Sequence, residues 1–235
     1  RILKRYSCFE PYARDEMAYA RSLLALPEGC RNEAVANLLE LLDQRLMGQL
    51  QKDEWFSAQQ NARVVKNAEA YYRAMLTGDV SSWNARDQHM METLELLLQR
   101  EGNSAKAIIW AHNSHIGDYR FSSMLDEGYL NLGGLARQHF GKESVALVGL
   151  TTYEGEVTAS SAWSGPEEIL PIPRARPSSI EGLLHDAALA LGRNSILLEF
   201  DNPSRTGPLA KKIGHRAIGV VYSAAAEASG RSYVP

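Results

Sequence analysis

The sequence predicts an α/β fold in which an N-terminal helical subdomain precedes a parallel or mixed sheet with flanking helices. The first observation is helical periodicity, which fills residues 1–102. The second is an alternation of short apolar runs with helical segments in residues 103–235. The third is an ordinary globular composition, with 45% hydrophobic and 23% charged residues in a chain of 235. We therefore expect a helical subdomain over residues 1–102 and an α/β portion over residues 103–235, the latter being part of a larger domain.

Four helices are expected in the helical subdomain. The first begins at Pro11, because proline suits the first turn of a helix. The second covers residues 32–52, where apolar residues recur with the i, i+3, i+4, i+7 spacing of an amphipathic helix. The third covers residues 55–76. The fourth covers residues 81–102, from a capping serine to a terminating glycine.

Residues 103–235 contain short apolar runs that are typical of strands covered on both faces. Helical segments are expected between them, near residues 134–140 and 179–191, so that strands and helices alternate. An edge strand is expected over residues 154–160, and four prolines predict an extended loop over residues 166–177. The apolar runs are residues 107–111, 144–150, 195–200 and 217–222.

Charge and apolar content exclude two classes of partner. The net charge is −3, and the 25 basic and 28 acidic residues are mixed along the chain, which argues against nucleic acid. No window approaches the ~20 apolar residues that a membrane-spanning helix needs. Cys8 and Cys30 form neither a disulfide framework nor a C-x-x-C site, so we expect reduced thiols in a cytoplasmic protein, with a single disulfide as the alternative.

Two histidines directly follow the predicted strand at residues 107–111. His112 ends this strand, His115 comes three residues later, and Asn113 lies between them as a donor and acceptor for binding. Ligands of open α/β sheets bind beyond the carboxyl ends of the strands. Imidazole titrates near neutral pH, so these histidines are candidates for general acid–base catalysis. The alternative is a metal site in which His112 and His115 share the ion with a third ligand.

Arg86 and Asp87 form the second candidate pair. Both are expected in the first turn of the fourth helix, at the edge of its buried face. Asp87 would gain about 0.3–1 kcal/mol there from the helix dipole, whereas Arg86 would not. An unpaired charge that faces a core costs about 3–5 kcal/mol, so Arg86 is expected to pair with Asp87 or with the oxyanion of a ligand.

The remaining polar residues carry weaker signals. Arg120 follows His115 within five positions and is a candidate for binding. The chain has no G-x-S-x-G, H-E-x-x-H or G-x-G-x-x-G pattern, which argues against the corresponding serine hydrolases, zinc proteases and nucleotide-binding folds. Glu199 and Asp201 are expected to be solvated loop acids, with a place for one of them near the site as the alternative. His185, which shares a helix with Glu181, is expected at the surface or in packing. His139 and His215 belong to no motif.

Several of these motifs together resemble the erythromycin esterase family, which is also associated with succinoglycan biosynthesis. The most specific are an Arg-Asp-x-x-Met motif at residues 86–90 and Ile-Trp-Ala-His-Asn-Ser-His-Ile-Gly-Asp at residues 109–118. The resemblance runs through most of the chain. Further similar segments are residues 5–12, 131–135, 153–159 followed by Trp163, and 178–185.

The resemblance implies a bacterial hydrolase that needs no metal or cofactor and uses a histidine to activate water against an ester or lactone. A macrolide is one such substrate, which would make the protein a macrolide-resistance enzyme. His112, His115, Arg86 and Asp87 match the family's catalytic pattern. The family's N-terminal Gly-Glu-x-x-His-Gly block has no counterpart, so we expect residue 1 to lie downstream of it. The alternatives are a non-catalytic binding or polysaccharide-biosynthesis accessory module, and a His-ligated metalloenzyme.

Overall fold

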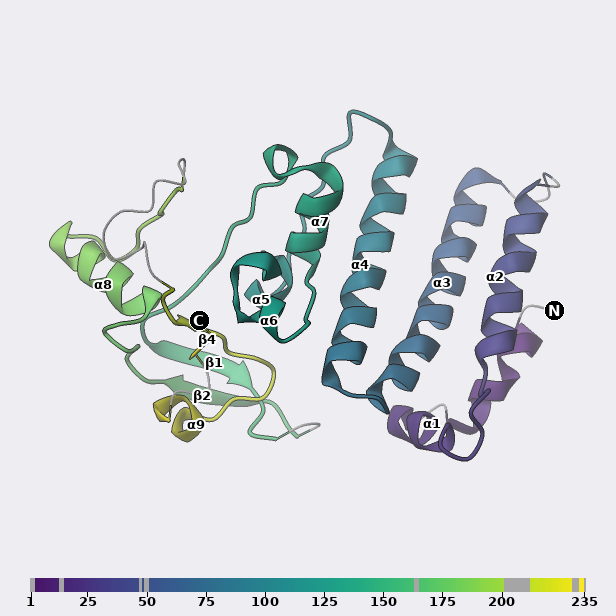
Figure 1. Ribbon diagram of the computed structural model, residues 1–235, viewed down its shortest axis with the longest axis horizontal. Coiled ribbons are helices and arrows are strands. Elements are labelled where there is room, and N and C mark those ends of the chain that lie inside the picture. The colour runs from purple at the N-terminus through teal and green to yellow at the C-terminus, as the bar shows by residue number, and fades with distance from the viewer. Residues whose placement is uncertain are drawn as a thin grey trace. The chain divides into compact units, whose positions relative to one another are not determined.

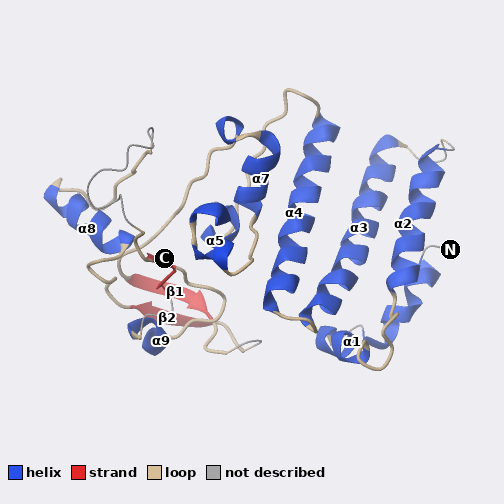
Figure 2. Ribbon diagram, in the orientation of Figure 1, coloured by secondary structure: helices blue, strands red, loops and turns tan. Residues whose placement is uncertain are grey.

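The computed structural model combines helices and strands, which confirms the α/β class, although the sheets are small (Figures 1 and 2). The residues that it describes are 3–12, 15–46, 48, 51–162, 165–200, 212–229 and 233–234. The chain divides into two compact units. The first contains Arg1–Ala111, His115–Arg120 and Met124–Ala146, and the second contains His112–Ser114, Phe121–Ser123 and Leu147–Pro235. The predicted domain boundary near Gly102 stays a prediction.

Helices form most of the chain between residues 3 and 144 in its described part (Figure 2). In order they are η1 (Leu3–Tyr12), α1 (Glu16–Ser22), α2 (Arg31–Leu46), α3 (Lys52–Met75), α4 (Asp79–Glu101), α5 (Asn113–Ile116), η2 (Tyr119–Phe121), α6 (Ser123–Asp126), α7 (Leu132–Phe140) and η3 (Lys142–Ser144). Among the described residues, none of the helices combines the length and the apolar character needed to cross a lipid bilayer.

Three of the four predicted helices are confirmed as α2, α3 and α4, which lie side by side in the first unit (Figure 1). Leu38 and Leu41 of α2 pack on Ala62 of α3, and the indole N–H of Trp55 donates to the Leu41 carbonyl at 3.2 Å. Helix α4 contacts α3 and α7. Its apolar face thus anchors α7, which borders the candidate site.

The first and fourth predicted helices begin at other residues than predicted. Pro11 lies inside the 3-10 helix η1 and does not open an α-helix; α1 begins after Asp15, whose carboxylate accepts the Ala18 N–H at 2.9 Å. Helix α4 begins two residues before Ser81, whose hydroxyl donates to the Gly78 carbonyl at 2.8 Å. The serine hydroxyls at positions 81 and 82 therefore bond back to the preceding carbonyls and do not cap the helix.

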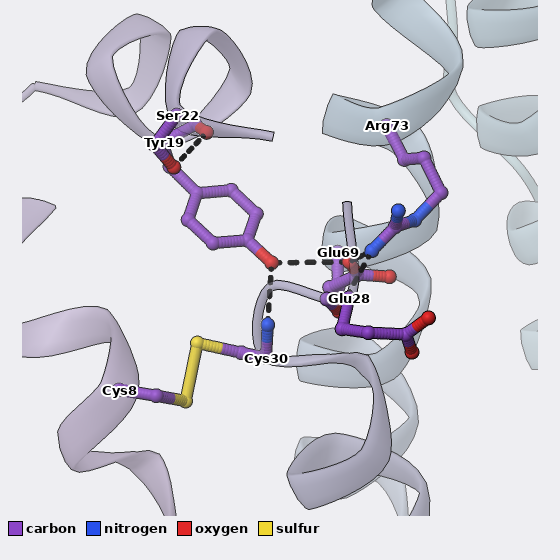
Figure 3. The surroundings of a disulfide bond; sticks show 7 residues. All are labelled: Cys8, Tyr19, Ser22, Glu28, Cys30, Glu69 and Arg73. Carbon is purple, nitrogen blue, oxygen red and sulfur yellow. Dashed lines mark hydrogen bonds and ion pairs between the residues drawn. A yellow bond between two sulfur atoms is a disulfide. The ribbon is translucent and has the colours of Figure 1, made fainter. Parts of the chain in front are cut away.

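A disulfide between Cys8 and Cys30 joins η1 to the start of α2, so the prediction of reduced thiols was wrong (Figure 3). The backbone N–H of Cys30 donates to the Tyr19 hydroxyl at 3.0 Å, and that hydroxyl donates to Glu69 at 3.0 Å. Arg73 pairs with the same carboxylate. Burial, together with the charge of Glu69, raises the pKa of Tyr19 to about 12. The disulfide thus ties down the loop that completes this buried network.

Replacing both Cys8 and Cys30 by Ser is expected to lower the free energy of unfolding by about 3 kcal/mol. The cross-link joins residues 22 positions apart and restricts the unfolded chain. Urea denaturation with and without a reductant measures the effect: the native protein should lose stability on reduction, and the double variant should not respond. A native protein with the same midpoint in both conditions would argue against the disulfide.

The second unit is built around two short antiparallel strand pairs. The predicted edge strand is confirmed as β1 (Gly155–Ala159), which pairs with β2 (Glu168–Ile172) in the register Gly155↔Ile172. The prediction of a loop over residues 166–177 was therefore wrong in part; Pro171 lies inside β2, and proline is tolerated in a strand at a sheet edge. The other elements are α8 (Ile180–Ala190), β3 (His215–Arg216), α9 (Ala224–Ala228) and β4 (Tyr233–Val234), with β3 paired to β4.

The predicted strands at residues 107–111, 144–150, 195–200 and 217–222 do not appear as strands in the described part of the chain. Ile108 is 97% exposed and Trp110 is 87% exposed. A strand needs hydrogen bonds from a neighbouring strand, and an apolar run supplies none by itself. Parallel pairing in the described residues is limited to the isolated bridge between Ser160 and Val221. Trp163 and Asp201, both named above, lie outside the described residues.

Candidate functional site

Asp87 and His115 form a hydrogen-bonded pair in the first unit. Asp87 lies on α4 with its carboxylate fully buried, and His115 lies on the one-turn helix α5 with its side chain 17% exposed. The His115 Nδ1 is 3.0 Å from Asp87 Oδ1 and 2.9 Å from Oδ2. A carboxylate only accepts hydrogen bonds, so Nδ1 carries the proton of the neutral ring and Nε2 presents the lone pair. His115 can therefore accept a proton at Nε2.

Helix α7 holds the carboxylate of Asp87 in place. The backbone N–H of Leu132, the first residue of α7, donates to Asp87 Oδ1 at 2.9 Å. Asn131 caps α7, since its Oδ1 accepts the Gly134 N–H at 3.1 Å. Asp87 was expected to gain from the dipole of its own helix, but α4 begins eight residues earlier, at Asp79. The helix whose N-terminus favours the negative charge is α7.

Trp83 and Arg86 complete this cluster. The Trp83 ring stacks on the His115 ring with a centroid distance of 4.6 Å and an interplanar angle of 5°. The Arg86 guanidinium carbon lies 4.7 Å from the Trp83 ring centroid. Arg86 is exposed rather than at a buried edge, and no ion pair joins it to Asp87 among the described residues. The expected Arg86–Asp87 pairing is thus replaced by stacking on Trp83, which the sequence reasoning did not single out.

His112 and Asn113 lie in the second unit. The exposed His112 accepts the Ser114 N–H at Nδ1 over 3.2 Å, so its neutral ring carries the proton on Nε2. Asn113 donates to the Leu150 carbonyl and accepts the Leu150 N–H at 3.1 Å. The side chain of Asn113 thus bridges backbone groups much as a strand would. A cavity shared by His112 and His115 stays a prediction, as does a binding role for Asn113.

Arg120 engages a carboxylate of the first unit. Its Nε and Nη2 each donate to Asp118 at 2.8 Å, and Arg137 lies 3.7 Å from the same carboxylate. Burial alone would raise the pKa of Asp118, but the hydrogen bonds and charges of the two arginines outweigh it and lower this pKa. Asp118 is therefore ionised and balances one of the two positive charges, while the binding role of Arg120 stays a prediction.

A second carboxylate–histidine pair, missed in the sequence, lies in the second unit. Glu181 is fully buried, and its Oε1 is 3.2 Å from His215 Nδ1. The same oxygen accepts the Thr151 hydroxyl at 2.6 Å and the Arg216 N–H at 2.9 Å. Burial would raise the pKa of Glu181, but these hydrogen bonds lower it to about 2. Since 34 residues separate Glu181 from His215, no local signal announces the pair. The His185 ring stacks on the Tyr153 ring with a centroid distance of 3.6 Å, which agrees with the predicted packing role of His185.

The depressed pKa of Glu181 makes the stability of the second unit depend on pH. A carboxylate whose pKa falls from its ordinary 4.5 to about 2 on folding stabilises the fold above pH 4.5, and this stabilisation disappears as the pH drops toward 2. We expect a loss of about 3 kcal/mol over this range. Urea denaturation at several pH values should show a smaller loss for Glu181→Gln, whereas Glu154→Gln, at an exposed ion pair with Arg174, should behave like the native protein. Equal acid sensitivity of the two variants would refute this assignment.

Comparison with known proteins identifies the family. The erythromycin esterase family model matches residues 1–235, the whole chain. No solved structure matches the chain. Among the described residues, no group of three or more His, Cys, Asp and Glu side chains is arranged to hold a metal ion. The match supports a hydrolase-type function at the level of the family. Asp87 and His115, which lie in the two motifs at residues 86–90 and 109–118, form a hydrogen bond. The chain belongs to the erythromycin esterase family.

Proposed function

We propose that the protein hydrolyses an ester or lactone bond of a small molecule, with His115 as the general base. The observation that carries the proposal is the pairing of His115 Nδ1 with the buried Asp87 carboxylate at 2.9 Å. This pairing holds the imidazole in the tautomer whose Nε2 accepts a proton from water, and the carboxylate balances the imidazolium that results. Neither step requires a metal or a cofactor.

The proposed reaction proceeds through a tetrahedral intermediate. Water attacks the carbonyl carbon while His115 Nε2 takes its proton, and the carbonyl oxygen becomes an oxyanion. The exposed guanidinium of Arg86 is assigned to this oxyanion, a contribution of about 3–4 kcal/mol for a well-placed donor. The intermediate then collapses to the carboxylic acid and expels the alkoxide, which receives from His115 the proton that came from water and leaves as the alcohol. A catalytic role for His112 stays a prediction of the sequence, which the variant His112→Asn tests.

The proposed substrates are small-molecule esters and macrolide lactones, and the proposed role in a bacterial cell is inactivation of such compounds. The compartment bears on the state of the cysteines. A cytoplasm would keep Cys8 and Cys30 reduced, whereas their disulfide favours an oxidising compartment over the cytoplasm expected from the sequence. Thiol quantification in the protein isolated from its native cells distinguishes the two compartments.

Replacing His115 by Gln in the full-length protein is expected to lower kcat by about 10²- to 10⁴-fold, because the general base is lost. Turnover is measured on a panel of small-molecule esters and macrolide lactones, with His112→Asn as a second variant. His139→Gln, whose imidazole is 47% exposed near Glu95, is the matched control and should retain activity. Unchanged turnover in His115→Gln would remove this residue from the reaction. A native protein that binds panel compounds but cleaves none would instead be an accessory binding module.

A further inference from the structure

We propose that Trp83 is a positioning residue of the candidate site, which fixes the plane of the His115 imidazole and seats the Arg86 guanidinium on the same indole. The proposal rests on the proposed role of His115 as a base. It assigns a function to a side chain that neither the family match nor the motif reasoning singles out.

The indole of Trp83 is itself held firmly. Its Nε1–H donates to the Leu130 carbonyl at 2.7 Å, and the Tyr129 ring meets it edge-on with a centroid distance of 6.1 Å and an angle of 89°. Trp83 lies one turn before Asp87 on α4, so the indole and the carboxylate project from the same side of the helix. Two side chains of one helix therefore hold the His115 ring, one at Nδ1 and the other across its face.

The hydrogen bonds to Asp87 fix one nitrogen of His115 but not the tilt of its ring. The χ2 torsion of histidine is soft, so the ring can rock about the Nδ1 contact and swing Nε2. A face-to-face stack at an angle of 5° opposes this motion. Misplacing a reacting group by about 1 Å costs about 10²-fold in rate, so the stack acts on the chemical step.

The Trp83 indole also stabilises the positive charge of the side chains that lie against it. When His115 takes a proton, it becomes a cation against the face of Trp83, and such cation–π contacts are favourable. The Arg86 guanidinium already lies 4.7 Å from the ring centroid. Trp83 therefore links the general base to the proposed oxyanion partner, and its loss is expected to release both groups.

Three variants of the full-length protein test the proposal. Trp83→Leu removes the stack and should lower kcat by about 10- to 100-fold with KM within about threefold. Trp83→Phe keeps an aromatic face but loses the hydrogen bond to Leu130, and should retain at least about a third of kcat. Trp55→Phe is the matched control, since its indole N–H also donates to a backbone carbonyl, that of Leu41. The kcat of Trp55→Phe should equal that of the native protein.

A readout independent of activity is ¹⁵N NMR of histidine-labelled protein. The native protein should show His115 in the Nδ1–H form, and Trp83→Leu should show exchange broadening of that proton. A native kcat together with a native His115 spectrum in Trp83→Leu would overturn the proposal. So would an equal decrease of kcat in Trp83→Leu and Trp83→Phe that parallels their decrease in thermal stability. Should Trp83→Leu not fold, Trp83→Met takes its place. If His115→Gln proves fully active, the proposed function fails while the NMR measurement still decides the role of Trp83.

Discussion

Asp87→Asn is expected to lower kcat for ester hydrolysis by about 10³- to 10⁴-fold, the effect of forcing a catalytic histidine into the wrong tautomer. Asp87 Oδ1 accepts the Leu132 N–H at 2.9 Å, so the amide oxygen of Asn takes that position and its NH₂ group faces His115. The NH₂ group replaces Oδ2, which lies 2.9 Å from His115 Nδ1, and a donor at that position favours an unprotonated Nδ1 and a ring proton on Nε2. A protonated Nε2 cannot take a proton from water.

The matched control for this variant is Glu69→Gln. Glu69 is also a buried carboxylate of the first unit, 3% exposed, but its partners are Tyr19 and Arg73 rather than a histidine. Glu69→Gln should keep the native kcat, although its free energy of unfolding should be lower than that of the native protein. Steady-state kinetics, circular dichroism and ¹⁵N NMR of His115 are the measurements. Full activity in Asp87→Asn, with His115 still in its native tautomer, would rule out the carboxylate as the orienting group.

Glu227→Ala is expected to lower the free energy of unfolding by about 3–5 kcal/mol, because it leaves the Arg216 guanidinium buried without its counter-charge. Both side chains are 1% exposed, and Arg216 Nη2 lies 2.6 Å from Glu227 Oε1. Arg216 also donates to the carbonyls of Thr152, Tyr153 and Pro173. These hydrogen bonds join β3 to the segment before β1 and to the residue after β2, so the effect should spread through the second unit.

A double-mutant cycle separates the charge from the packing. The cycle consists of the native protein, Arg216→Met, Glu227→Met and the double Met variant. The double variant removes both charges and keeps apolar volume, so its loss of stability should be smaller than the sum of the losses of the two single Met variants. Urea denaturation of the four proteins supplies the free energies. Strict additivity, or a Glu227→Ala protein as stable as the native one, would show that the pair does not couple.

The helices were predictable because their hydrogen bonds are local. The periodicity of residues 32–52 and 55–76 identified the start of α2 and both ends of α3 to within three residues. The predicted end of the second helix was wrong, because α2 ends at Leu46 and Lys52 begins α3. Gly102 was correctly identified as the end of α4, where a φ of 98° suits glycine. The start of α4 was missed because Gly78, which precedes it, caps with no side-chain hydrogen bond.

The strands were predicted poorly because their partners are remote in the chain. The apolar run at residues 107–111 resembles a buried strand, yet a side-chain pattern cannot state which segment will supply the ladder of hydrogen bonds. Conversely, β2 contains Pro171, which lowers the strand signal of a segment that does pair. Strand positions therefore follow from pairing, which the one-dimensional pattern does not contain.

For the candidate site, the sequence by itself determined which residues are candidates: His115, Asp87 and Arg86 stand in the motifs that resemble the family, and their side chains have acid–base properties that suit hydrolysis. Only the tertiary structure decided which of them meet. Asp87 forms a hydrogen bond with His115, 28 residues away, and the Arg86 guanidinium lies against the Trp83 ring. The physical reason is that a buried carboxylate must find donors wherever the packed helices bring them, and α7 and α5 bring the Leu132 N–H and the His115 ring to Asp87.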